Sequence, residues 1–356
     1  MRLDERPPFR EDITSPTLIG WLHIGAFLLH LISGVLGYYA CQSHNPEFRL
    51  TVPLFEFVKG ASDINSFIKP LPTTAAHVRS FTPSLFVEFF TAGAHLIYWF
   101  AMTFDGFDYY IRKVLPSPSA NPLRWVEYAI TASVMSSFGG VNMGMNDFFY
   151  LMKTFALGVI LQTCGYLIEL LDSTSDDRRD KIFFNVLYWI VGYISNFVSV
   201  GLMLGQLFAS KLHSELHLFI ENSLPFAFYF SLFGIVCRYS YQKRGLWIDP
   251  WFAEKYYIVL SWSTKIAVFW LSFGTYRKII ADLGFGSSGI NWDAVRYCAI
   301  AIPFVPLAII FVYDMIRWKS VEKMMKKQSA RRELTMTERA QNERRATETR
   351  YKKFNI

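Results

Sequence analysis

The most informative stretch of this chain is YYIVLSWSTKIAVFWLSF, residues 256–273. It has the length and apolarity of a transmembrane helix, and Lys265 lies near its centre, with no other basic residue between Lys255 and Arg277. A charge at that depth costs several kcal/mol or more, so an intramembrane lysine indicates a functional site. A reaction of the amine would explain such a lysine, because a lysine in a desolvated pocket can form a Schiff base with an aldehyde.

Apolar runs long enough to cross a bilayer of about 30 Å recur along the whole sequence, of which 52% is hydrophobic. Eight such runs lie near residues 17–40, 84–104, 123–142, 148–171, 183–208, 220–241, 253–275 and 297–316. The first is too long for a signal-peptide core and lacks a small-residue cleavage site, so we expect it to be retained. The sequence therefore predicts an all-α membrane protein with a seven-helix bundle plus an additional eighth transmembrane helix.

Basic residues in the loops predict the orientation in the membrane. If the N-terminus is cytoplasmic, most of the 36 Lys and Arg lie on the cytoplasmic side, many of them after Ile316. An even number of spans then places residues 1–16 and the tail, residues 317–356, in the cytoplasm. The basic tail accounts for the net charge of +7, so we expect no nucleic-acid partner. We expect the tail to lie against anionic lipid of the bilayer, with docking of a cytoplasmic partner as the alternative.

Residues 41–83 form the only long external loop of this topology. Its stretch FRLTVPLFEFV, residues 48–58, is rich in Val, Leu and Phe and alternates imperfectly, which favours a short β-hairpin with Pro53 at an edge. Exposed apolar strand edges pair with other strands, so this loop also indicates a homodimer contact.

A protonated Schiff base is a buried cation and needs an anion nearby. The carboxylates at membrane depth are Glu88, Glu127, Asp147 and Glu169. Glu127 is the strongest candidate because the apolar and small-polar run YAITASVM follows it and commits it to the membrane. Its competing interpretation is a helix-start carboxylate beside Arg124, favoured by the helix dipole.

Other polar residues lie in the same apolar surroundings. Ser261 is four residues before Lys265 and therefore on the same side of its helix. His30 and His95 are deep in their apolar runs, and Glu88 shares a face with His95. Single histidines of this kind usually pack in a core, but two of them facing Glu127 would indicate a polar cavity. No His or Cys spacing in the chain predicts a metal site, and we expect no enzymatic activity.

Several motifs resemble one family. RWVEYAITASVM, residues 124–135, resembles the third-helix signature of the heliorhodopsins, a retinal-binding family distinct from the ion-pumping microbial rhodopsins. SWSTK, residues 261–265, resembles the family's serine and retinal lysine. HLISGVL at 30–36 and GYLIE at 165–169 resemble its first-helix histidine segment and the end of its fourth helix. The third-helix motif is specific, and the other motifs support it.

The resemblance implies that residues 17–278 form a rhodopsin-like bundle carrying all-trans retinal. It makes Lys265 the attachment site, Glu127 the counterion and Ser261 a neighbour of the Schiff base. The other implied cofactor-binding residues are Thr131, Met135 and Gly165, and the implied polar cavity holds His30, His95 and Glu88. The resemblance also implies a cytoplasmic N-terminus and a dimer. Thr131 replaces a family serine, and the eighth helix in residues 279–316 and the basic tail lie outside the family pattern.

Three classes of function are compatible with these residues. The first is a light sensor that does not pump ions, and the second is a light-driven or light-gated proton or ion conductor. The third is a non-photochemical transporter that uses an intramembrane lysine. Outward proton pumps of the usual microbial type keep a second carboxylate on the third helix, and the position eleven residues after Glu127 is Phe138. The sequence therefore favours the sensor.

Overall fold

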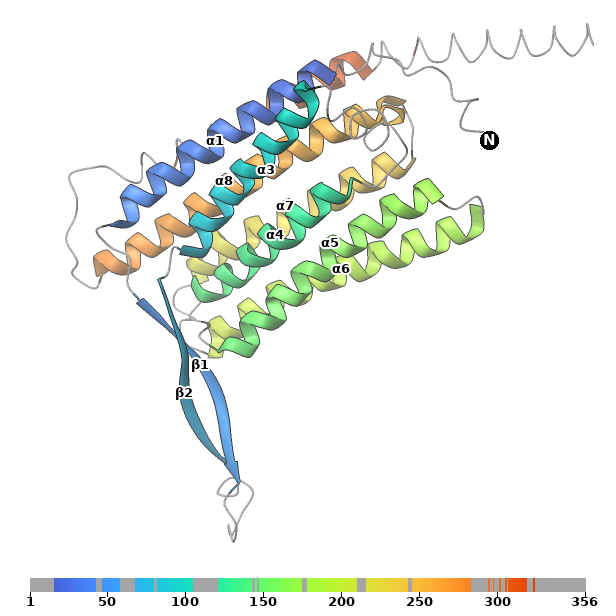
Figure 1. The fold of residues 1–356 in the computed structure, drawn as a ribbon. Helices are drawn as coiled ribbons and strands as arrows, with labels where there is room; N and C mark the ends of the chain where they lie inside the picture. Colours follow the sequence, from blue (N-terminus) through green and yellow to red (C-terminus); the bar gives the residue numbers. More distant parts are fainter. Residues whose placement is uncertain are drawn as a thin grey trace, which may run out of the picture.

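The computed structural model is a bundle of long α-helices with one β-hairpin at its end (Figure 1). It describes residues 16–42, 47–57, 68–79, 82–104, 121–142, 145, 147–174, 178–209, 216–242, 245–282 and 307–318, with single positions at 294, 297, 301, 305 and 323. The long helices are α1 (Pro16–Gln42), α3 (Thr82–Thr103), α4 (Pro122–Asn142), α5 (Phe148–Thr174), α6 (Arg178–Ala209), α7 (Leu216–Gln242) and α8 (Pro250–Asp282). A 3₁₀ helix, η5 (Gly245–Ile248), precedes α8, and residues 307–318 are also helical.

The helices run alternately in opposite directions between two ends of the bundle (Figure 1). Helices α1, α4, α6 and α8 begin at one end, which we call the terminal end, and α3, α5 and α7 begin at the other, the hairpin end. α1 packs on α3, α4 on α5, α5 on α6 and α7 on α8. α8 also contacts α1, α3 and α4, so it lies inside the bundle.

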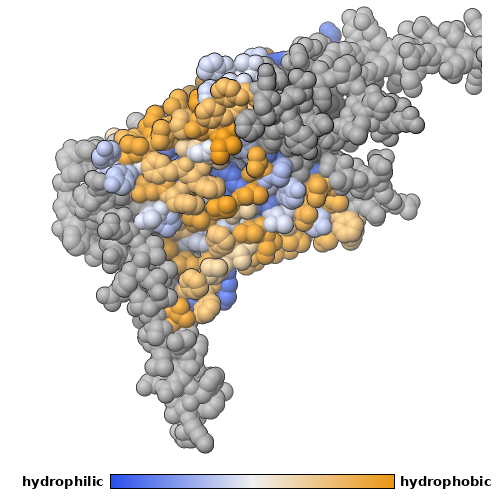
Figure 2. All heavy atoms as spheres, in the orientation of Figure 1, coloured by the Kyte–Doolittle hydropathy of each residue, from blue (hydrophilic) through white to orange (hydrophobic). Residues whose placement is uncertain are grey.

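The surface of the bundle is apolar, as expected for a protein in lipid. Five of the described helices are long and apolar enough to cross a membrane: Thr17–Ala40, Thr82–Thr103, Phe148–Leu171, Ile182–Gln206 and Trp251–Gly274. Trp21, Phe183 and Phe197 are each more than half exposed, and Figure 2 shows apolar residues over much of the bundle face in view. α4 and α7 are not among the five, and α4 carries small polar side chains that the interior buries. The all-helical membrane bundle was predicted correctly.

The interior is organised around α8. Every side chain from Trp251 to Trp270 is buried, so Lys265 lies at the centre of the most enclosed helix. The half of α8 toward the hairpin end contributes Phe269, Trp270 and Phe273 to an aromatic cluster. Phe138 of α4 belongs to the same cluster. Position 138, where outward proton pumps of the usual type have a carboxylate, therefore holds a phenylalanine in apolar contacts.

The loop between α1 and α3 contains two antiparallel strands, β1 (Glu47–Phe57) and β2 (Ile68–Arg79). Pro53 faces Pro72, and a register shift lies between Leu50 and Thr51. Because the sheet has only these two strands, each strand is also an edge. The N-terminal segment before Pro16 and most of the predicted tail lie outside the described residues.

The contact between α4 and α5 depends on a glycine. A Cβ on Gly158 of α5 would lie 2.6 Å from Ser133 Oγ and 2.8 Å from Ser133 Cα on α4. The backbone atom cannot move away without shifting a helix, so the glycine permits close approach, as small residues do in membrane helix pairs.

We therefore expect Gly158→Ala to lower stability by about 1–3 kcal/mol through overpacking. Gly93→Ala in α3 is the control, because a Cβ there meets nothing within 4 Å. Thermal unfolding in detergent compares the two variants with the parent protein. Equal midpoints for Gly158→Ala and Gly93→Ala would contradict the role given to this contact.

Candidate functional site

Lys265 pairs with Glu127 inside the bundle. The Lys265 ammonium donates to Glu127 Oε1, which comes from a residue 138 positions earlier in the chain. Both side chains are buried, with 5% and 7% of their surface exposed. The Lys265 nitrogen also lies 5.1 Å from the centre of the Tyr128 ring, where a cation is attracted by the face of the aromatic ring. The structure thus brings together the lysine and the carboxylate that the sequence singled out.

Two threonines hold the Glu127 carboxylate. Thr91 of α3 and Thr131 of α4 donate to the same oxygen that contacts Lys265, at 3.1 and 3.2 Å. Thr131 also bonds the backbone carbonyl of Glu127 at 2.9 Å, which is the usual bond of a threonine to the preceding turn of its helix. Hydrogen bonds to a buried carboxylate offset its loss of hydration. Thr91 was missed in the sequence, although it lies on the helix face shared by Glu88 and His95.

The other predicted carboxylates lie elsewhere. Asp147 accepts from the backbone amides of Phe149 and Tyr150, at 2.7 and 3.1 Å, and so caps the start of α5. Glu169 pairs with Arg124 at the terminal end and accepts from the Trp125 indole at 2.7 Å. Among the four carboxylates weighed in the sequence, Glu127 is the one that contacts Lys265.

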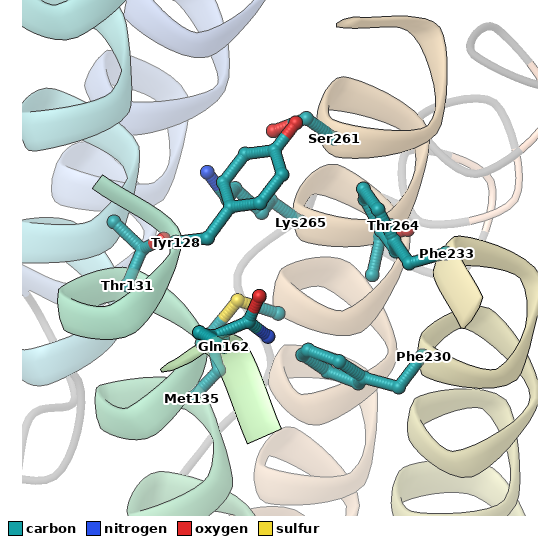
Figure 3. Close-up of a pocket in the computed structure, with 10 residues that line it drawn as sticks. Tyr128, Thr131, Met135, Gln162, Phe230, Phe233, Ser261, Thr264 and Lys265 are labelled. Atoms are coloured by element: carbon teal, nitrogen blue, oxygen red, sulfur yellow. The ribbon is translucent and has the colours of Figure 1, made fainter. Parts of the chain in front are cut away.

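An apolar cavity of about 270 Å³ adjoins the Lys265 amine (Figure 3). It is lined by residues of α4, α5, α7 and α8: Tyr128, Thr131, Ala132, Met135, Gln162, Phe230, Phe233, Ser261, Thr264 and Lys265. Ser261 is fully buried one turn before Lys265 and lies beside the Tyr128 hydroxyl. Thr131, Met135 and Ser261, which the sequence assigned to the cofactor, thus share one cavity with the lysine.

A second cavity of about 470 Å³ shares Gln162, Phe230 and Phe233 with the first. Gly165 lies in its wall, where a Cβ would meet the Trp125 ring at 2.2 Å, so a glycine is needed for the indole to pack there. The two cavities therefore lie next to each other along the three shared residues, and the Lys265 amine borders the first.

Histidines and Glu88 form a buried polar row beside the ion pair. His30 Nδ1 lies 2.7 Å from Glu88 Oε2, and His23 Nδ1 lies 2.9 Å from His95 Nδ1. The His30 and His95 rings stack with their centroids 5.9 Å apart. Glu88, Thr91 and His95 follow one face of α3, so this row reaches Glu127 through Thr91. His23 was not predicted, and its position seven residues before His30 is the signal that could have found it.

Three atoms of this row lack hydrogen-bond partners among the described residues: His30 Nε2, Glu88 Oε1 and His95 Nε2. Buried polar atoms of this kind normally bind internal water or share a proton. The row therefore has the chemistry of a polar cavity next to the ion pair.

The lysine, its carboxylate and the adjoining apolar cavity define a rhodopsin-type membrane protein, whose retinal chromophore requires such a lysine. The heliorhodopsin family model matches residues 19–276, which is more than half of the chain. The chain belongs to the heliorhodopsin family, and the resemblance found in the sequence is confirmed. The comparison with curated proteins gave no match.

Proposed function

We propose that this protein is a light sensor of the heliorhodopsin type that holds all-trans retinal on Lys265 and does not pump ions outward. The observation that carries the proposal is the buried Lys265–Glu127 pair beside the apolar cavity. Retinal supplies light absorption and isomerisation when bound. The residues of the chain supply attachment, charge compensation and exclusion of water.

Each residue of the site has a defined part in this proposal. Lys265 would hold retinal through its side-chain nitrogen: the ammonium and the aldehyde would lose one water between them, and one of the three ammonium protons would stay on the linkage nitrogen. Glu127 compensates that positive charge, as it compensates the ammonium in the structure. Thr91 and Thr131 fix the orientation of the carboxylate, and Ser261 contributes a hydroxyl on the same side of α8.

Phe138 supports the sensor over an outward pump. It is 3% exposed and packs with Ile266 and Trp270 in the hairpin half of the bundle. A proton leaving the site in that direction along α4 meets an aromatic contact where the usual pump has a carboxylate. An apolar contact offers no group that could take up the proton.

Proton conduction is the second candidate function. The row of Glu88, His30 and His95 favours it, because these titratable groups are buried beside the ion pair and have unpaired polar atoms. Buried carboxylates and histidines in membrane proteins often form proton relays. A leak or a channel-like path would use this row.

We also propose that an eighth span after α8 places both termini in the cytoplasm. The excess of Lys and Arg in the tail supports this orientation, because clustered basic residues resist translocation. The two-stranded hairpin supports a homodimer through pairing of its strand edges. The tail's charge suits anionic lipid or a cytoplasmic partner.

Lys265→Ala should abolish the retinal-dependent visible band while the protein still inserts into the membrane. Alanine has no amine to condense with the aldehyde. The measurement is an absorption spectrum of purified protein after addition of all-trans retinal, with membrane insertion checked by fractionation. A visible band that persists in this variant would refute the attachment site.

Glu127→Gln should shift the visible band to longer wavelength or leave the Schiff base unprotonated at neutral pH. Both effects follow from removing the anion that stabilises the buried cation. Spectra recorded over a pH series measure the change, with Glu88→Gln as the matched control. If Glu127→Gln matches the parent and Glu88→Gln shifts the band, Glu88 is the counterion.

Illumination should produce no sustained outward proton transport. The reason for this expectation is the aromatic contact at Phe138, which occupies the position of the missing carboxylate. Photocurrents are measured in voltage-clamped cells that express the protein. A steady, pH-dependent photocurrent would favour the conductor, and its loss in Glu88→Gln would assign the path to the histidine row.

A further inference from the structure

Gln162 of α5 is a buried polar side chain in the wall of the cavity that adjoins Lys265. It is 4% exposed, and its amide end points into this cavity (Figure 3). No hydrogen bond joins the Gln162 side chain to another of the residues that the structure describes. An amide in apolar surroundings costs free energy unless it has a polar or charged partner. The position of Gln162 therefore indicates a ligand whose charge or polar group the amide can contact.

Gln162 lies on the side of the cavity away from α8. It is the α5 residue in the lining of the first cavity, and with Phe230 and Phe233 it also lines the second. The lining of the second cavity comes from α4, α5, α6 and α7, whereas Thr264 and Lys265 of α8 line the first. A molecule that is attached to Lys265 and fills the first cavity therefore has Gln162 beside a part remote from the attachment point.

The lining fits a chromophore of the retinal class. Lys265 offers the amine for attachment, and Glu127 offers the negative charge that balances a protonated linkage. The rings of Phe230 and Phe233 offer apolar contacts. In a protonated retinal linkage the positive charge is centred near the nitrogen in the dark, and light absorption moves it along the polyene away from the nitrogen. A dipole remote from Lys265 therefore acts more strongly on the excited state than on the ground state.

We propose that Gln162 sets the colour of this retinal site by facing its amide oxygen toward the polyene, an inference that rests on the proposed function. The oxygen can take this orientation because no hydrogen bond to the described residues fixes the amide. It stabilises the positive charge that reaches this side of the cavity on excitation. The transition energy falls, and the visible band moves to longer wavelength. Glu127 acts differently, because it stabilises the charge at the linkage itself.

The test compares absorption spectra of the full-length protein in detergent after addition of all-trans retinal. Gln162→Leu should move the visible band to shorter wavelength by several nanometres, because leucine has a similar size and no dipole. Gln162→Met should do the same, and its flexible side chain serves where leucine packs poorly. A parent-like band in both variants would overturn the inference, and so would loss of the band in both.

Two matched variants change other lining residues of the same cavity. Met135→Leu exchanges one apolar side chain for another of similar volume, so the band should stay in place. Thr264→Val removes a hydroxyl on the α8 side, where the charge is greater in the dark, so it should not move the band to shorter wavelength. If either control shortens the wavelength as much as Gln162→Leu does, the shift is a general response of the cavity and the role given to Gln162 is wrong.

Thermal unfolding of the same variants without retinal gives a measurement that is independent of light absorption. Gln162→Leu should unfold at the midpoint of the parent or above it, because leucine avoids the cost of burying an amide that has no partner. A midpoint several degrees lower would show that the amide holds the fold together, which would contradict the inference. Failure of the proposed function has a different signature, since the parent protein itself would then form no visible band with retinal.

Discussion

The buried pair of Lys265 and Glu127 is the constraint on which the rest of the bundle depends. Removing one partner of such a pair typically costs about 3–5 kcal/mol, because the other charge stays in a medium that cannot hydrate it. The pair therefore fixes how α4 and α8 are aligned along each other. The hydrogen bonds within each helix do not set this alignment. Thr91 adds α3 to the same contact. Three helices meet at one carboxylate oxygen, and the apolar cavity lies next to it.

Polar contacts and close packing hold the helices of this bundle together, whereas hydrophobic burial does so in the core of a water-soluble protein. Lipid is as apolar as the interior, so burial in the bundle gives little driving force between helices. Gly158 and Gly165 permit close contacts of α5 with Ser133 and Trp125 of α4. The small polar residues that keep α4 from being strongly apolar are buried between helices. The outward faces of α1 and α6 are apolar instead, which suits a lipid environment.

Local sequence patterns predicted the helices well, because the length and apolarity of each run are enough to indicate a helix in the membrane. The carboxylate that pairs with Lys265 could be predicted because Glu127 precedes a run that cannot leave the membrane. The remaining polar contacts join residues far apart in the chain, and no local pattern encodes such pairs. Arg124 and Lys255 lie near the starts of their apolar runs, and the structure buries both in ion pairs. Asp314, near the end of the last apolar run, accepts from the Lys255 ammonium and from the Tyr256 hydroxyl.

The two sides of the central pair differ in the kind of group that borders them. Toward the terminal end lie two further groups of buried charges, Arg124 with Glu169 and Glu254, and Lys255 with Asp314. Toward the hairpin end, beyond the contact between His30 and Glu88, lies the aromatic cluster around Phe138. A protein built for transport needs titratable groups that continue toward both surfaces. Among the described residues, the titratable row continues toward the terminal end through His95 and His23, whereas an aromatic cluster borders the site toward the hairpin end, which supports the proposed light sensor over an outward pump.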